Sequence, residues 1–128
     1  MFRIDPNTSR INITRGDIGT IELTIKKDDG TSYVFQDSDV VRFSVYEIKD
    51  FNGEPVLLKN VIPEEDSTSV DIELLQDDTT IGELINKPVT YWYEIQLNPD
   101  TAPQTIIGYD QYGAKEFILY PEGGKYDN

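Results

Sequence analysis

Residues 91–97 read Tyr-Trp-Tyr-Glu-Ile-Gln-Leu, a segment with large apolar or aromatic side chains at every second position. The odd-numbered positions hold Tyr, Tyr, Ile and Leu, whereas the even-numbered positions hold Trp92, Glu94 and Gln96. Successive side chains of a β-strand point to opposite faces, so this alternation predicts a strand with one face toward a core. The same alternation places Trp92 on the face away from that core.

The two-residue period recurs along the chain. It is clear in residues 21–26, 41–46 and 70–75, and weaker in 9–14, 32–36, 56–61, 104–109 and 115–120. Turn-forming residues separate these segments, as in Asp28-Asp29-Gly30, Phe51-Asn52-Gly53 and Asn98-Pro99-Asp100. An Asp-Gly pair tolerates the positive φ that a tight hairpin turn of the primed type requires. Short strands punctuated in this way indicate an all-β sandwich or barrel.

Residues 77–84 depart from the strand pattern. They are expected to form a single helical turn, capped by Asp77 or Asp78, because carboxylates suit the positive end of a helix. Ile81 and Leu84 would then lie on one face and cover an end of the sandwich. The chain after residue 120 is polar and rich in glycine. We therefore expect one domain over residues 1–120 and a flexible tail over residues 121–128.

The composition excludes several classes of function. The chain has neither cysteine nor histidine, which excludes disulfides, zinc sites and Ser-His or Cys-His nucleophiles. It has 24 acidic and 11 basic residues, a net charge of −13, and lacks the basic face that nucleic acids and anionic membranes require. No apolar run approaches the length of a membrane span or a secretion signal. We expect no catalytic residue, no cofactor, and neither nucleic acid nor membrane as a partner.

Acidic residues gather in four places, a pattern to weigh against carboxylate catalysis and calcium binding. The clusters lie at 28–29, 37–39, 64–66 and 77–78. Glycoside hydrolysis needs two facing carboxylates, and an EF-hand needs oxygen ligands at alternate positions around a central glycine. No segment has the EF-hand spacing, so we interpret the clusters as turn residues, caps and solvated surface, and expect no metal site.

Arg15-Gly16-Asp17 is the tripeptide that integrins recognise. It lies between the expected strands 10–14 and 18–27, which leaves too few residues for a long mobile loop. Gly16 permits the backbone angles of a tight turn, Asp17 can accept neighbouring backbone N–H groups, and Arg15 can pair with a carboxylate across the sheet. We interpret the tripeptide as a rigid kink that carries the chain from one sheet to the other, with integrin binding as the alternative.

Five segments in order resemble a known family: Ile13–Asp17, Asp39–Tyr46, Leu75–Thr79, Tyr91–Leu97 and Thr105–Ile107. Together they look like the N-terminal immunoglobulin-like domain of baseplate upper proteins, and of related tail proteins, from phages and prophages of Gram-positive bacteria. The resemblance covers about residues 10–120. It implies an immunoglobulin-like antiparallel β-sandwich of roughly seven to nine strands, with Arg15, Gly16 and Asp17 as a structural signature and no catalytic residues.

What the resemblance implies about function is a non-enzymatic structural component of a phage tail or baseplate. Such a protein would be made in the bacterial cytoplasm and incorporated into the virion, with other tail proteins or further copies of itself as partners. The candidate interface residues are Trp92, Tyr109 and Tyr112, since large exposed aromatic groups tend to mark interfaces. The alternative is a carbohydrate- or calcium-binding sandwich module of a cell-surface or adsorption protein, suggested by the aromatic strand 91–97 and the acidic turns.

Overall fold

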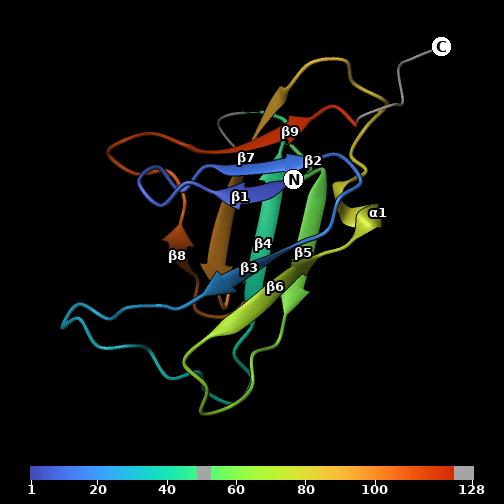
Figure 1. Ribbon diagram of the computed structural model, residues 1–128. Coiled ribbons are helices and arrows are strands. Elements are labelled where there is room, and N and C mark those ends of the chain that lie inside the picture. The colour runs from blue at the N-terminus through green and yellow to red at the C-terminus, as the bar shows by residue number, and fades with distance from the viewer. Residues whose placement is uncertain (49–52, 123–128) are drawn as a thin grey trace.

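A computed structural model describes residues 1–48 and 53–122 (Figure 1). Over these residues the chain forms nine strands and one short helix. In chain order they are β1 (Phe2–Ile4), β2 (Ile11–Thr14), β3 (Gly19–Leu23), β4 (Val41–Tyr46), β5 (Leu57–Val61), β6 (Val70–Leu74), α1 (Gln76–Thr79), β7 (Val89–Leu97), β8 (Gln104–Ile107) and β9 (Lys115–Tyr120). The all-β expectation is therefore confirmed.

The strands form two sheets. The larger has the order β1-β2-β9-β7-β4-β5, and β8 also pairs with β7. The smaller consists of β3 and β6, which cross in front of the larger sheet in Figure 1. All pairs are antiparallel except β2 with β9. Strands β4, β7 and β9 form a central antiparallel trio, and the second sheet faces them. The strands of the two sheets alternate along the chain. This is the arrangement of an immunoglobulin-like sandwich.

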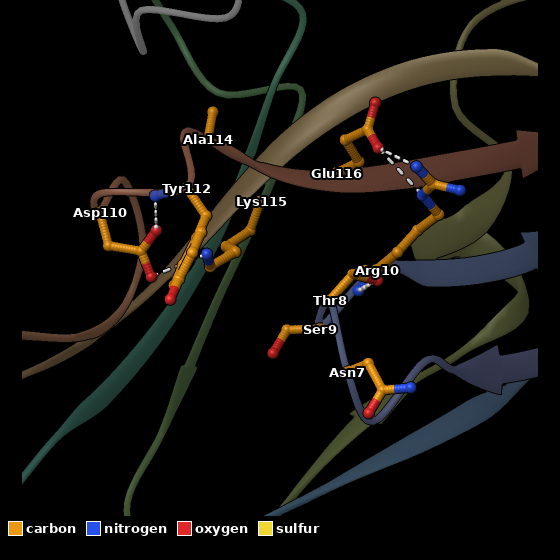
Figure 2. A pocket seen from close by; sticks show the side chains of 9 residues that line it. All are labelled: Asn7, Thr8, Ser9, Arg10, Asp110, Tyr112, Ala114, Lys115 and Glu116. Atoms are coloured by element: carbon orange, nitrogen blue, oxygen red, sulfur yellow. Dashed lines mark hydrogen bonds and ion pairs between the residues drawn. The ribbon is translucent and has the colours of Figure 1, made fainter.

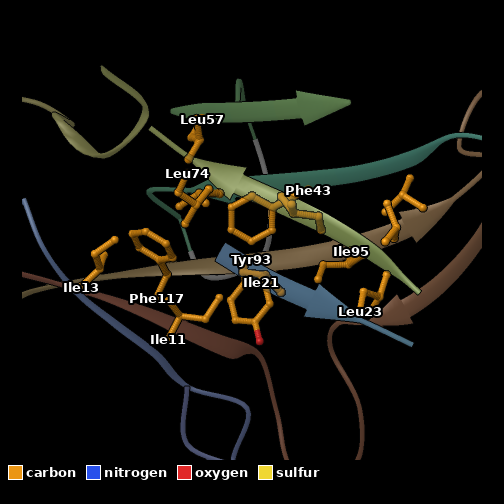
Figure 3. Packing of buried hydrophobic residues seen from close by; sticks show 14 of the residues in the cluster. Ile11, Ile13, Ile21, Leu23, Phe43, Leu57, Leu74, Tyr93, Ile95 and Phe117 are labelled. Atoms are coloured by element: carbon orange, nitrogen blue, oxygen red, sulfur yellow. The ribbon is translucent and has the colours of Figure 1, made fainter. Parts of the chain in front are cut away.

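The core lies between the two sheets and follows the predicted alternation. In β7 the odd-numbered residues from Tyr91 to Leu97 are buried, and the even-numbered ones are partly exposed. The rings of Phe43, Tyr93 and Phe117 pack in tilted contacts at its centre, with the centroid of Phe43 5.6 Å from that of Tyr93 and 6.2 Å from that of Phe117 (Figure 3). Ile21 and Leu23 of β3 and Ile72 of β6 close the core from the smaller sheet. Burial of these aromatic and branched side chains supplies the main stabilising free energy.

Two strand predictions were too long. The segment 18–27 contributes β3 only as far as Leu23, and residues 32–36 contribute one isolated bridge, Lys26 with Ser32. The hairpin between them has Gly30 at φ +87°, while Asp28 and Asp29 keep negative φ. It is therefore a three-residue loop closed by a glycine bulge and not the primed turn that the sequence suggested.

The helical turn is also displaced from its predicted position. Helix α1 covers Gln76–Thr79, and its first free backbone N–H group, at Leu75, donates to the Asp78 carboxylate at 2.8 Å. Asp78 thus acts from inside the helix and not as the residue that precedes it. Ile81 is buried as expected, but Leu84 is exposed because the chain leaves the helical path at Thr80.

Candidate functional site: the Arg15 corner and the 108–114 excursion

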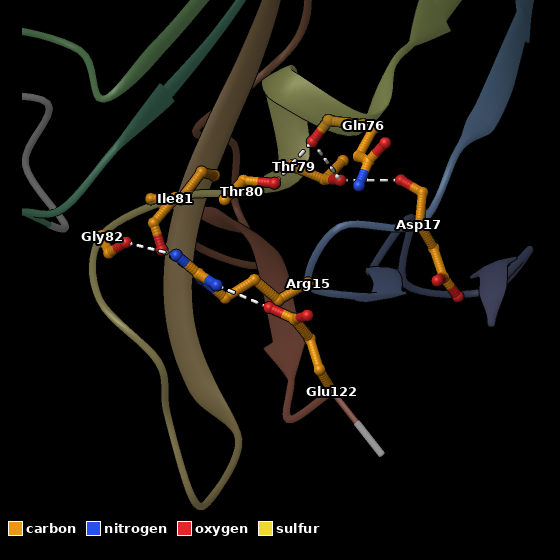
Figure 4. Close-up of polar contacts among 8 residues, drawn as sticks. All are labelled: Arg15, Asp17, Gln76, Thr79, Thr80, Ile81, Gly82 and Glu122. Atoms are coloured by element: carbon orange, nitrogen blue, oxygen red, sulfur yellow. Dashed lines mark hydrogen bonds and ion pairs between the residues drawn. The ribbon is translucent and has the colours of Figure 1, made fainter. Parts of the chain in front are cut away.

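Arg15 lies at the corner where the chain passes from β2 in the larger sheet to β3 in the smaller one. Its side chain is only 8% exposed. The guanidinium donates to the backbone carbonyls of Ile81 (3.0 Å) and Gly82, and to the Glu122 carboxylate at 2.5 Å (Figure 4). The Arg15 side chain therefore joins three segments that are distant in the sequence, and little of it is exposed to solvent.

Gly16 and Asp17 complete the corner through their backbones. Gly16 has φ +85°, which favours glycine, and its N–H group donates to the Thr79 carbonyl. The Thr79 hydroxyl donates to the Asp17 carbonyl at 2.7 Å. The Asp17 carboxylate contacts the amino group of Met1, and not the backbone N–H groups that the sequence suggested. The tripeptide is the predicted link between the sheets, since it leads directly from β2 to β3.

The structure describes the first two residues of the expected tail, Pro121 and Glu122. Both are partly buried, and Glu122 pairs with Arg15. The pair ties Glu122 to the corner, because a buried guanidinium that loses its partner costs about 3–5 kcal/mol. The rest of the expected tail, residues 123–128, lies outside the described residues, as does most of the turn at 51–53.

Trp92 lies on the outer face of the larger sheet, opposite Tyr91 and Tyr93, as the alternation predicts. It is partly buried, between Tyr46 of β4 and Glu116 of β9 in the strand register. Ile118 is also nearly buried although its position in β9 faces the same outer side. Trp92 is therefore only partly accessible, on a face of the sheet that also carries the buried Ile118.

Tyr109 and Tyr112 lie on an excursion, residues 108–114, that interrupts a strand. In the register of β7, Ile107 of β8 is opposite Ile95 and Lys115 of β9 is opposite Tyr93. Only one β7 residue, Glu94, separates those two partners, so the seven residues 108–114 must leave the sheet. They present Tyr109 at 65% and Tyr112 at 84% exposure.

The excursion is held in a defined shape by its own hydrogen bonds. Asp110 and Gly113 exchange backbone hydrogen bonds of 3.2 and 2.9 Å, with Gly113 at φ +98°. The Asp110 carboxylate accepts the Tyr112 N–H group and the Lys115 ammonium, each at 2.8 Å. The bond from Lys115 is the largest of the effects that lower the pKa of Asp110. The two tyrosines are thus displayed on a tight turn.

A hollow of about 530 Å³ separates the excursion from the turn between β1 and β2 (Figure 2). Its walls are Asn7, Thr8, Ser9 and Arg10 on one side and Asp110, Tyr112, Ala114, Lys115 and Glu116 on the other. The sequence signal for the excursion was the pair Gly108 and Gly113 around two tyrosines. The alternation of residues 104–109 and 115–120 predicts two strands, but it does not show that both pair with the same edge of β7.

The buried carboxylate of Asp39 has a structural role. It accepts hydrogen bonds from the Tyr33 hydroxyl (2.7 Å), the Gln36 N–H group (2.8 Å) and the Asn98 amide (2.9 Å). Burial raises the pKa of Asp39, but the hydrogen bonds outweigh burial and leave that pKa lowered. The bond to Asp39 in turn raises the pKa of Tyr33 to about 12. All the carboxylate's partners are loop or strand-end groups, so it fixes the chain between β3 and β4.

Within residues 1–48 and 53–122, no group of three or more acidic side chains is placed to hold a metal ion. Nor does this part of the chain contain a helix that is long and apolar enough to cross a membrane. A comparison with protein-family models finds no match, and comparisons with curated proteins and with solved structures find none either.

Proposed function

We propose that this chain is a non-enzymatic structural domain that assembles with other proteins in the tail or baseplate of a phage or prophage. The ordered sequence resemblance motivates the assignment to a tail. The observation that supports assembly is an apolar free edge of the larger sheet at β5. Among the described residues β5 pairs only with β4, so its other side offers unpaired backbone groups.

The side chains around this edge are unusually apolar for an exposed strand. Leu58 is 45% exposed and Ile62 is 76% exposed, and Val56 precedes them at the start of the strand. The one lysine of β5, Lys59, is turned toward Asp78 of α1 at 2.8 Å and does not guard the edge. Natural proteins often place charged side chains on a free sheet edge to prevent pairing with other chains. An apolar edge without such charges is suited to pair with a strand of a neighbouring protein in an assembly.

Several charged side chains of the described residues have structural partners, which supports a structural role. The ion pairs of Arg10 with Glu116, Arg42 with Asp100 and Lys115 with Asp110 are at least partly exposed on the surface, whereas the pair of Arg15 with Glu122 is largely buried. The buried Asp39 carboxylate accepts hydrogen bonds from three donors, Tyr33, Gln36 and Asn98. Such groups stabilise loops and strand ends, and none is positioned for proton transfer to a substrate.

The test is incorporation into particles. Virions or tail particles from a lysogen that encodes this protein are purified and labelled with a specific antibody, and the gene is replaced by Leu58→Lys/Ile62→Lys. Wild-type protein is expected in the particles, and the edge variant is expected to fold but to stay in the soluble fraction. Leu84→Lys is the control, since Leu84 is also exposed but lies outside β5. Absence of the wild-type protein from every particle fraction, or hydrolysis of cell-wall glycan at enzymatic rates, would end this proposal.

The second candidate function is carbohydrate binding, and one observation favours it: the exposed ring of Tyr112 beside a polar hollow. Calcium binding, the other part of that alternative, gains no support from the acidic clusters in the described part of the chain. Asp28 and Asp29 belong to the hairpin loop, and Asp78 binds Lys59 and the start of α1.

A further inference from the structure

Both walls of the hollow between the β1–β2 turn and the 108–114 excursion are preorganised. On the excursion side, Asp110 holds the turn that carries Tyr112. On the other side, Asp5 accepts the N–H groups of Asn7 and Thr8, at 2.8 and 3.4 Å. The buried Tyr93 donates its hydroxyl hydrogen to the Ser9 carbonyl and so ties this turn to the core. A site whose walls are already fixed loses little conformational entropy when a ligand binds.

The charges around the hollow are balanced. Arg10 donates to Glu116 through two guanidinium nitrogens, and Lys115 donates to Asp110. Two cations and two carboxylates thus neutralise one another locally, although the whole chain has a net charge of −13. An ionic ligand would have to break one of these pairs, whereas a neutral ligand would not. The charge balance therefore favours a neutral, hydrogen-bonding ligand.

The hollow also presents polar groups that have no partner among the described residues. These are the side-chain amide of Asn7 and the hydroxyls of Ser9 and Tyr112, for which the structure records no hydrogen bond. Figure 2 shows the Tyr112 side chain on one wall and the Ser9 and Asn7 side chains on the other. An open hollow of about 530 Å³ is within the usual size of small-molecule sites.

From these features we propose that the hollow is a binding site for a neutral, hydroxyl-rich sugar. The apolar C–H face of a sugar ring would lie on the Tyr112 ring, whose negative face attracts the slightly positive hydrogens. The hydroxyls would exchange hydrogen bonds with Asn7 and Ser9, and with the outer oxygens of Asp110 and Glu116. The proposal does not depend on the assembly function, since the β5 edge and this hollow are formed by different strands.

The test is a titration of the whole chain, followed by NMR, with a panel of neutral sugars: glucose, galactose, N-acetylglucosamine and their disaccharides. Glucuronic acid serves as the charged comparison. At least one neutral sugar is expected to shift the amide signals of residues 7–10 and 109–116. Tyr112→Ala should weaken binding at least about tenfold, as is typical of a central aromatic contact. Tyr112→Phe should stay within about threefold, because the ring face remains.

Tyr109→Ala is the matched control, because Tyr109 lies on the same excursion but does not line this hollow. It should leave the affinity unchanged. Binding should also change less than about twofold between low and high salt, since no net charge is neutralised. Sedimentation with purified cell-wall glycan, beside the soluble sugars, distinguishes a polymeric source of the ligand from a free one.

Three results would overturn the assignment. The first is that no neutral sugar shifts those signals at concentrations of tens of millimolar. The second is that a sugar binds equally well to wild type and Tyr112→Ala. The third is that glucuronic acid alone binds, with strong dependence on salt. Because Tyr112 is 84% exposed, its replacement should not unfold the protein, and the amide spectrum of the free variant verifies this directly.

Discussion

Replacement of Arg15 by alanine is the sharpest test of how the two sheets are joined. The guanidinium is 8% exposed and makes three hydrogen bonds, to the carbonyls of Ile81 and Gly82 and to the Glu122 carboxylate. A hydrogen bond to a charged group contributes about 1.5–3 kcal/mol net, and removing one partner of a buried ion pair costs about 3–5 kcal/mol. Glu122 lies close enough to the surface for water to recover part of this loss. We expect Arg15→Ala to lower the free energy of unfolding by about 3–4 kcal/mol.

The assay is urea unfolding, followed by far-ultraviolet circular dichroism and by the fluorescence of the single tryptophan, Trp92. A loss of this size corresponds to a fall in melting temperature of roughly 10–15 °C for a domain of this length. Arg15→Lys should recover little of the lost free energy of unfolding. The planar guanidinium directs its N–H groups at two carbonyls and a carboxylate together, and an ammonium group cannot reproduce that geometry.

The matched control is Arg10→Ala, because Arg10 also pairs with a carboxylate, Glu116, but is about half exposed. Exposed pairs contribute about 0.2–1 kcal/mol, so this variant should lose less than about 1 kcal/mol. A double-mutant cycle of Arg15→Ala with Glu122→Ala should show coupling of about 1–2 kcal/mol. Equal and small losses of unfolding free energy in Arg15→Ala and Arg10→Ala would show that the Arg15 side chain does not hold the two sheets together.

Three further predictions concern stability. Asp39→Asn should cost about 2 kcal/mol at pH 7, because the amide cannot accept from every donor that surrounds the carboxylate. Since the folded-state pKa of Asp39 lies below its ordinary value of 3.8, its stabilising effect is present above that pH and is lost as pH falls further. The deficit of Asp39→Asn measured by urea unfolding should therefore shrink at pH 3, and a constant deficit would contradict the assignment. Gly19→Ala should lower the free energy of unfolding by about 1–3 kcal/mol, because an added Cβ would lie 2.4 Å from the Phe2 ring. A fall in melting temperature smaller than that caused by a substitution at an exposed site would disprove this close packing. Tyr93→Phe should cost about 1–2 kcal/mol and speed amide hydrogen exchange in residues 5–10, because the Ser9 carbonyl loses its donor; unchanged exchange would show that the turn is held otherwise.

The alternation of apolar residues determines which face of each main strand meets the core. In β4, β6 and β7 the predicted inward positions are all buried, because a period of two directs one face of a strand to the core, although Ser44 on the opposite face of β4 is buried as well. The same local rule located the link at Arg15-Gly16-Asp17, where a glycine with positive φ was needed between two strands. The composition also bounded the chemistry, since a chain without histidine or cysteine has few ways to build a reaction centre.

Tertiary structure alone decided which distant residues meet. Nothing local indicates that Glu122 would lie beside Arg15, since 107 residues separate them and the contact depends on the parallel pairing of β2 with β9. The 108–114 excursion was equally hidden, because it exists only through the register of β8 and β9 on one edge of β7. Alternation is a property of one strand, whereas pairing and register are properties of two. For that reason the sequence determined the faces of the strands and the location of the sheet-to-sheet link, and the folded chain decided the ion pair that holds the corner and the hollow beside Tyr112.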